Sequence, residues 1–239
     1  MSGITVGTRA SSLGRFIALR AVFIVVATAC DKDSSSPGLA PGAITVTAGA
    51  AQTAVVNTAL ASAIAVLVTD ASGNPLAGVS VSFTPSSASG SVSATQVTTD
   101  ATGTAQVTWT LGTVAGADSL AVSVGTLTPI TAVATATPDI AAAIAVVSGN
   151  DQSAPAGTTL ASPLSVKVTD KYGNAVPNAT VSWTVDNNGV LTQATTVTDQ
   201  NGVAQDVLAL GPSAGNEDVV AMILVNSAPV TASFTEDGM

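Results

Sequence analysis

Residues 64–74 read IAVLVTDASGN, and residues 164–174 read LSVKVTDKYGN. Apolar and polar residues alternate strictly in the second stretch before its turn, and Ile64, Val66 and Val68 keep the same phase in the first. This period of two is typical of a half-buried β-strand, and the Asp, Gly and Asn that follow favour a tight turn. The return of the same strand and turn after 100 residues predicts two copies of one β-rich unit.

The repeat extends well beyond this stretch. The matched segments are Ser80–Phe83 with Thr180–Trp183, Thr99-Asp100 with Thr198-Asp199, Leu111-Gly112 with Leu210-Gly211, and Pro129 with Pro229. Further alternating runs, separated by Gly, Asn and Pro, give six or seven short strands in about 95 residues, which is typical of a β-sandwich. No helical stripe interrupts them, so the sequence predicts an all-β chain.

The composition excludes several classes of function. The chain has 239 residues, a formal net charge of −9, one Cys and no His. Without His, neither a Ser-His-Asp or Cys-His catalytic arrangement nor a His-ligated metal site can form. All three Arg lie within residues 1–20, and the remainder from Cys30 onward has three Lys against 15 acids. Nucleic acids and anionic membrane surfaces are therefore poor partners.

The first 29 residues have the pattern of a secretory signal peptide. Residues 1–20 contain three Arg and no acid, and the apolar run that follows is shorter than the roughly 20 residues that a membrane span needs. A small-residue cleavage site, Ala27-Thr28-Ala29, precedes Cys30. We expect residues 1–29 to direct export. Residues 30–42 follow as a flexible linker rich in Ser, Pro and Gly.

The segment Ala27–Cys30 resembles the lipobox of bacterial lipoproteins, in which the Cys is lipidated and becomes the new N-terminus. That family usually has Leu where Ala27 stands, so ordinary cleavage after Ala29 stays open. A lone Cys in an exported chain has no internal disulfide partner, which favours lipidation over a free or intermolecular thiol. In some Gram-negative bacteria an Asp at the position of Asp31 marks retention in the inner membrane. The resemblance implies a lipid anchor at Cys30, in the outer membrane, at the cell surface or on the periplasmic face of the inner membrane.

The body of the chain resembles the group 1 bacterial immunoglobulin-like domain of invasin and intimin adhesins. The ordered motifs V-T-D-x-x-G-N, V-S-[FW], T-D-x-x-G-x-A-Q and a late A-G occur in both copies. The resemblance implies two tandem Ig-like β-sandwich domains at residues 43–138 and 139–236, with residues 237–239 as a tail. It also implies a role outside the cytoplasm, in adhesion or as a spacer. We expect neither the outer-membrane barrel nor the receptor-binding domain of those adhesins here, so no binding residue is carried over.

Carboxylates are the strongest candidates for chemistry. The repeated turns contain Asp70, Asp100, Asp170 and Asp199. An Asp at the start of a turn accepts hydrogen bonds from the following backbone N–H groups; a Ca²⁺ site, the alternative, needs six to eight converging oxygens. Glu217-Asp218 and Glu236-Asp237 are adjacent acids. Neighbours on a strand point to opposite faces, so we expect solvated acids here rather than a facing catalytic pair.

Three other features stand out. Phe83 and Trp183 occupy equivalent inward positions, and Trp109 is matched by Leu208, which suggests that core volume is exchanged between the copies. Asp206 aligns with an inward Val, which indicates a bulge or a position at the sandwich rim. Tyr172 is either a contact residue or a turn residue whose ring lies on its own domain.

The sequence therefore predicts a protein that is not an enzyme and has no catalytic, cofactor or metal site. The favoured function is a non-catalytic cell-envelope lipoprotein, anchored to the membrane through Cys30 and acting in adhesion or as a structural spacer. The alternative is a periplasmic or secreted accessory module. Its expected partner is a cell-surface protein or polysaccharide, and not a nucleic acid.

Overall fold

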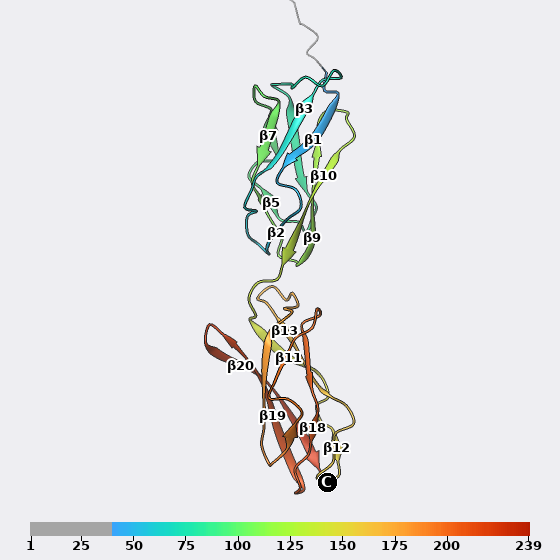
Figure 1. Ribbon diagram of the computed structural model, residues 1–239, viewed down its shortest axis with the longest axis vertical. Helices are drawn as coiled ribbons and strands as arrows, with labels where there is room; N and C mark the ends of the chain where they lie inside the picture. The colour runs from blue at the N-terminus through green and yellow to red at the C-terminus, as the bar shows by residue number, and fades with distance from the viewer. Residues whose placement is uncertain (1–39) are drawn as a thin grey trace, which may run out of the picture. The chain divides into compact units, whose positions relative to one another are not determined.

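The computed structural model describes residues 40–239 (Figure 1), so the predicted signal peptide, Cys30 and most of the linker lie outside the described residues. All regular secondary structure in this part of the chain is β-strand. No helix within residues 40–239 is long and apolar enough to cross a membrane. The strands form two β-sandwiches that follow one another along the chain, which confirms the predicted all-β fold.

The first sandwich is built from ten strands. They are β1 (Ala43–Ala48), β2 (Gln52–Val55), β3 (Ile64–Thr69), β4 (Ser80–Pro85), β5 (Ser91–Val92), β6 (Gln96–Thr98), β7 (Thr104–Val107), β8 (Trp109–Thr110), β9 (Gly116–Ser123) and β10 (Ile130–Thr137). A three-stranded sheet of order β1-β3-β7 packs on a five-stranded sheet of order β2-β10-β9-β4-β6, and β5 pairs with β8.

The second sandwich repeats this plan. Its strands are β11 (Ala143–Ser148), β12 (Ser153–Ala154), β13 (Leu164–Thr169), β14 (Thr180–Val185), β15 (Val190–Leu191), β16 (Thr195–Val197), β17 (Val203–Asp206), β18 (Leu208–Ala209), β19 (Gly215–Val225) and β20 (Ala228–Gly238). The two sheets have the orders β11-β13-β17 and β12-β20-β19-β14-β16, and β15 pairs with β18. Strand β20 ends at Gly238, inside the segment predicted as a tail.

In each sandwich the chain crosses from one sheet to the other near its start. β1 pairs antiparallel with β3, shifts register between Val46 and Ala48, and the chain then joins the other sheet as β2, parallel to β10. Gly49 lies at this crossover with φ +83°, and a Cβ there would lie 2.2 Å from the carbonyl oxygen of Ala63. Only glycine fits such a close backbone approach. Gly149 repeats the arrangement in the second sandwich.

The cores confirm the predicted inward positions. Phe83 and Trp109 are fully buried in the first sandwich. In the second sandwich Trp183 is buried against Phe234, with ring centroids 6.1 Å apart and planes inclined at 34°. Phe234 occupies the position of a buried Ala in the first copy, so the predicted exchange of core volume involves a third position that sequence reasoning missed.

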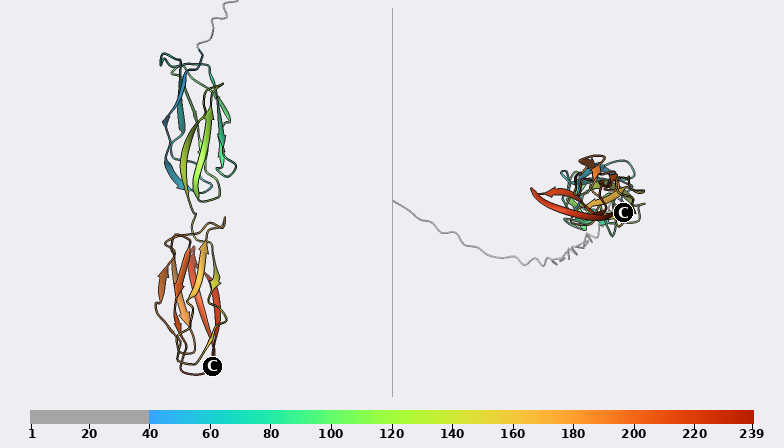
Figure 2. Two further views of the ribbon diagram at one scale, coloured as in Figure 1. Left: turned by 90° about the vertical axis from the view of Figure 1, so that its right-hand side faces the viewer. Right: turned by 90° about the horizontal axis from the view of Figure 1, so that it is seen from below.

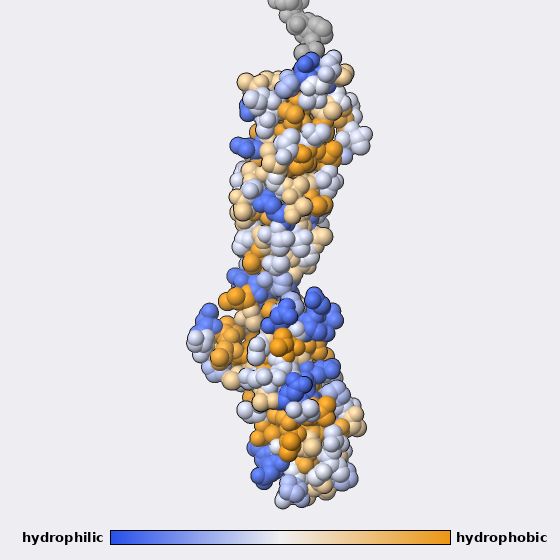
Figure 3. Space-filling view, viewed as in Figure 1, coloured by the Kyte–Doolittle hydropathy of each residue, from blue (hydrophilic) through white to orange (hydrophobic). Residues whose placement is uncertain are grey.

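The hairpin that ends the second sandwich is longer than its counterpart. β9 and β10 have 8 residues each, whereas β19 and β20 have 11. Asn226 and Ser227, at φ 50° and 69°, close the longer hairpin as a two-residue turn. Its tip stands away from the rest of the second sandwich (Figures 1 and 2), and apolar surface lies on it (Figure 3). Leu224 near the tip is 66% exposed.

Candidate functional site

The repeated turns are held by their Asp side chains. Asp170 Oδ1 accepts hydrogen bonds from the backbone N–H groups of Tyr172 and Asn174, both at 2.9 Å, and Oδ2 accepts one from the Asn174 amide at 2.9 Å. Asp70 makes the equivalent bonds in the first copy. Asp100 and Asp199 each accept two backbone N–H groups in their own turns. The predicted structural role of these four acids is confirmed.

Hydrogen bonds also lower the pKa values of the Asp side chains in these turns. Burial alone would raise the pKa of Asp170, but hydrogen bonds from Asn174, Asp139 and Tyr172 bring that pKa below its ordinary value. The side-chain hydrogen bond from Asn74 is the main cause of the lowered pKa of Asp70. Across residues 40–239 no group of three or more His, Cys, Asp or Glu side chains could hold a metal ion.

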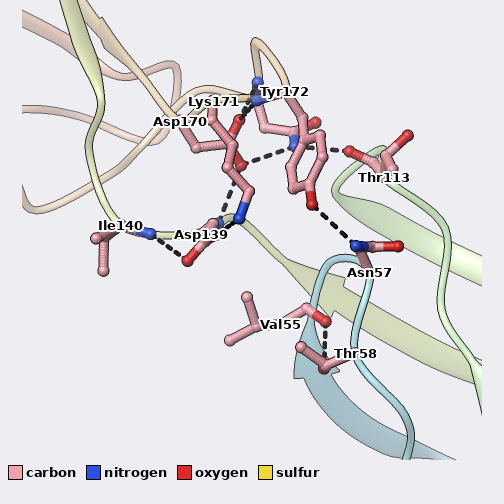
Figure 4. Close-up of polar contacts among 10 residues, drawn as sticks. Val55, Asn57, Thr58, Thr113, Asp139, Ile140, Asp170, Lys171 and Tyr172 are labelled. Atoms are coloured by element: carbon pink, nitrogen blue, oxygen red, sulfur yellow. Dashed lines mark hydrogen bonds and ion pairs between the residues drawn. The ribbon is translucent and has the colours of Figure 1, made fainter.

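The outer side of the second-copy turn contacts the first sandwich (Figure 4). Tyr172 Oη accepts a hydrogen bond from the Asn57 amide at 3.0 Å, and its ring packs against the core of the first sandwich. The Asn174 amide donates to the carbonyl oxygen of Thr113 at 2.8 Å and accepts from the N–H of Ala115 at 2.9 Å. Tyr172 is therefore a contact residue, and what it contacts is the neighbouring sandwich.

The segment that joins the sandwiches is fixed to the same turn. The N–H of Asp139 donates to Asp170 Oδ2 at 3.0 Å, and Lys171 Nζ lies 2.9 Å from Asp139 Oδ2. The hydrogen bond from Lys171 is the main cause of the lowered pKa of Asp139, and it raises the pKa of Lys171 in turn. Because Lys171 is 60% exposed, this ion pair adds little to stability. Lys171 also lies 5.0 Å from the ring centre of Tyr172.

The first-copy turn lacks the groups that make this contact. Ala71 and Ser72 stand where the second copy has Lys171 and Tyr172. Asn74 makes hydrogen bonds only within its own turn among the described residues. The two turns thus share one internal structure, and only the second carries the side chains that reach another sandwich. We call this set of interactions the joint: Asn57, Thr113, Ala115, Asp139, Asp170, Lys171, Tyr172 and Asn174.

The prediction of solvated acids is wrong for Glu217 and Glu236. Glu217 is 0% exposed and Glu236 is 1% exposed, while their neighbours Asp218 and Asp237 lie on the exposed face. The reason is register. β19 and β20 are regular strands through both pairs, so alternation turns one acid of each pair into the sandwich. Burial is the main cause of the raised pKa of Glu236, and the nearby charge of Asp151 adds to it.

The sequence predicts a bulge or a rim position at Asp206, and in the structure Asp206 pairs with Leu164 without a register shift. It is the last residue of β17, is separated from β18 by Val207, and is buried. Its carboxylate accepts hydrogen bonds from the N–H of Val207 at 2.8 Å and from the N–H of Gln193 at 3.1 and 3.2 Å. The acid therefore accepts hydrogen bonds from nearby backbone donors, which accounts for an inward carboxylate.

Residues 144–235 match the family model of the bacterial Ig-like domain (group 1). The second sandwich is similar to a bacterial Ig-like domain. In sequence, no curated protein matches the chain.

The solved structures of FdeC and InvD share this Ig-like fold. The adhesin FdeC of Escherichia coli matches with 18% identity and a TM-score of 0.56, over 84% of this chain and 67% of that one. InvD of Yersinia pseudotuberculosis matches with 24% identity and a TM-score of 0.51, over 77% of this chain and 55% of that one. The D0–D1 domains of intimin match with 21% identity and a TM-score of 0.34, over 82% of this chain and 98% of that one. The chain spans about half the length of the InvD structure.

Sequence reasoning found part of the joint. It singled out Tyr172 and the turn Asp of the second Ig-like domain, but it missed Asn57 and the backbone groups of Thr113 and Ala115. One signal was available: Lys171 and Tyr172 replace two small residues in an otherwise repeated turn. The predicted lipidation site, Cys30, lies outside the described residues and stays a prediction.

Proposed function

We propose that this chain is a non-catalytic, exported cell-envelope lipoprotein whose two Ig-like domains act as a stiff spacer for adhesion. One observation carries the proposal. The turn that contains Asp170 is hydrogen-bonded to the first sandwich through Tyr172 and Asn174. The segment that connects the sandwiches is hydrogen-bonded to the same turn through Asp139. Such a joint costs conformational freedom that a simple flexible tether would keep.

The other elements of the proposal come from the sequence and the relatives. The predicted lipid on Cys30 anchors the chain, and residues 30–42 give the first sandwich reach from the membrane. FdeC, which shares the fold, is named as an adhesin. A catalytic role has little support in residues 40–239, because they contain no His and their paired carboxylates are enclosed within a sandwich.

A second candidate is an accessory module that binds a protein partner in the periplasm or outside the cell. The hairpin of β19 and β20 favours it, since residues 219–235 contain no charged side chain and Leu224 is largely exposed near the tip. Exposed apolar surface of this kind is commonly used in protein contacts. If the chain is such a module, the joint fixes the orientation of the β19–β20 hairpin relative to the first sandwich, so that the hairpin can contact the partner.

Lipid labelling and protease treatment of intact cells test the proposal. Cells expressing the native chain or Cys30→Ala are labelled with a fatty-acid analogue and then exposed to protease. Labelling of the native chain alone, with loss of the sandwiches to protease, supports an anchored surface spacer. Labelling without protease sensitivity favours the periplasmic module, and absence of labelling refutes the anchor. Distances between spin labels on the two sandwiches test stiffness separately, because a broad distribution contradicts a stiff joint.

A further inference from the structure

Two glutamates enter the second sandwich side by side. Glu217 on β19 and Glu236 on β20 are direct partners in the antiparallel register, so both side chains lie on the same face. That face is the inner one, and both residues are completely enclosed. Trp183 and Phe234 fill the same core, with Phe234 two residues before Glu236 on the same strand.

Each carboxylate is only half satisfied. Glu217 Oε1 accepts a hydrogen bond from the N–H of Gly211, and Glu236 Oε2 accepts one from the N–H of Gln152 at 2.7 Å. The remaining oxygens, Glu217 Oε2 and Glu236 Oε1, are buried and have no hydrogen-bond partner. A buried carboxylate in this state is strongly disfavoured as an anion unless a cation or a proton neutralises it.

No basic side chain is available to neutralise the pair. The other titratable side chains near this pair are Asp151, Asp186, Asp218 and Asp237. All of them are acidic. In residues 40–239 the basic side chains are Lys167, exposed on β13 in the other sheet, and Lys171, which pairs with Asp139.

The first sandwich provides an internal comparison. Asp118 stands at the position of Glu217 and accepts a hydrogen bond from the N–H of Gly112 at 3.1 Å, the counterpart of the bond to Gly211. Its antiparallel partner, at the position that Glu236 holds in the second sandwich, is Ala134. The first copy therefore has one inward acid where the second has two. Glu217 is larger than its counterpart Asp118, and Glu236 replaces an Ala, so the shared fold does not require the second acid.

We propose that the second sandwich folds with a proton bound at the Glu217–Glu236 pair, which makes this end of the chain more stable in mildly acidic surroundings than in alkaline ones. A bound proton converts a carboxylate oxygen that has no hydrogen-bond partner into a hydroxyl group that can donate, and it removes one buried negative charge. No third ligating side chain is present in the described part of the chain, so a proton fits the pair better than a metal ion does.

The sign of the effect follows from the ionisation of Glu236. Its pKa is raised in the folded chain, mainly by burial. The stabilisation is therefore fully present below the ordinary pKa of 4.5 and is lost as the pH rises through the folded pKa. The turn acids act in the opposite direction and at lower pH, because their pKa values are lowered.

The two Trp residues allow each sandwich to be followed separately in the full chain. Trp109→Leu leaves Trp183 as the reporter of the second sandwich, and Trp183→Phe leaves Trp109 as the reporter of the first. Each substitution introduces the residue that the other copy already has at that position. Thermal unfolding followed by Trp fluorescence between pH 5 and pH 8, with EDTA present, then gives a melting temperature for each sandwich.

We expect the melting temperature of the second sandwich to fall by several degrees from pH 5 to pH 8, while that of the first stays flat. Glu236→Gln keeps the size of the side chain but cannot ionise, so it should abolish the fall and raise stability at pH 8. A flat profile of the second sandwich overturns the proposal, and so does an undiminished fall in Glu236→Gln. If CaCl₂ in place of EDTA restores stability at pH 8, the pair is a metal site and the proton assignment is wrong. If the Gln variant fails to fold, the pH dependence of the melting temperature of the second sandwich with both glutamates present still tests the proposal.

Discussion

The phenolic oxygen of Tyr172 in the second sandwich accepts a hydrogen bond from the amide of Asn57 in the first, at 3.0 Å. Residue 72, at the equivalent place in the first copy, is Ser and has no such partner among the described residues. The residue at this turn position, Tyr172 in the second copy and Ser72 in the first, thus distinguishes the sandwich that bonds to the one before it in the chain.

Tyr172→Ser should loosen the joint without unfolding either sandwich. The change removes one interdomain hydrogen bond and the packing of the ring, but the turn keeps its Asp170 bonds, as the first copy does with Ser72. Electron paramagnetic resonance distances between labels on the two sandwiches should broaden. The free energy of unfolding should fall by no more than about 1–2 kcal/mol, the value of one hydrogen bond and some ring packing, and both sandwiches should stay folded. An unchanged distance distribution would show that Tyr172 does not restrain the joint.

Asn174→Ala should cost more than Asn74→Ala. Both substitutions remove an amide that bonds the turn Asp, but only Asn174 also bonds Thr113 and Ala115 of the other sandwich. Each lost hydrogen bond is worth roughly 1 kcal/mol, so the difference between the variants should be about 1–2 kcal/mol. Urea unfolding of both variants measures it. Equal losses would mean that the interdomain bonds contribute nothing to stability.

Trp183→Ala should destabilise the second sandwich by about 3–5 kcal/mol, because a buried aromatic ring is removed and leaves a cavity against Phe234. Denaturant unfolding followed by circular dichroism measures the loss. Val197, an exposed residue on β16, provides a matched control, since Val197→Ala should change stability little. A melting curve of Trp183→Ala that overlays the native one would contradict the assigned core.

Acid should weaken the turns in both sandwiches. Hydrogen bonds lower the pKa of Asp100 and Asp199 below the ordinary 3.8, chiefly those from Thr102 to Asp100 and from Val203 to Asp199. Their stabilisation is present above pH 3.8 and is lost as the pH falls through the lower, folded pKa. Melting temperatures should therefore drop below about pH 4. In Asp100→Asn the drop should be smaller, and an equal drop would exclude a contribution from this turn.

The sequence predicted the fold well because the informative features are local and repeated. Alternation placed Val66, Phe83 and Trp183 in the cores, and the repeated Asp positions predicted turns whose bonds the structure contains. Such features depend on neighbours a few residues away, so they can be recognised without knowing which strands meet.

The joint and the buried acids depend on distant residues. Asn57 and Tyr172 are 115 positions apart, and nothing in the pattern around either one indicates the other. Alternation along a strand puts one acid of each adjacent pair on each face, but only the strand register shows that Glu217 and Glu236 are the two that point inward. Phe234 was missed for a similar reason: it compensates for the smaller Leu208 across a core whose packing partners only the fold reveals.

The parallel pairing of β2 with β10, and of β12 with β20, has a mechanical consequence. In each sandwich the strands joined are close to the two ends of the repeat and run in the same direction. A tensile force between the two ends of a sandwich pulls such strands lengthwise past one another, so their hydrogen bonds must rupture together and not one by one. Four residue pairs resist this shear in the first sandwich, from Gln52–Ala134 to Val55–Thr137, and two resist it in the second. Each sandwich can therefore carry tension along the chain without its parallel strands separating one hydrogen bond at a time.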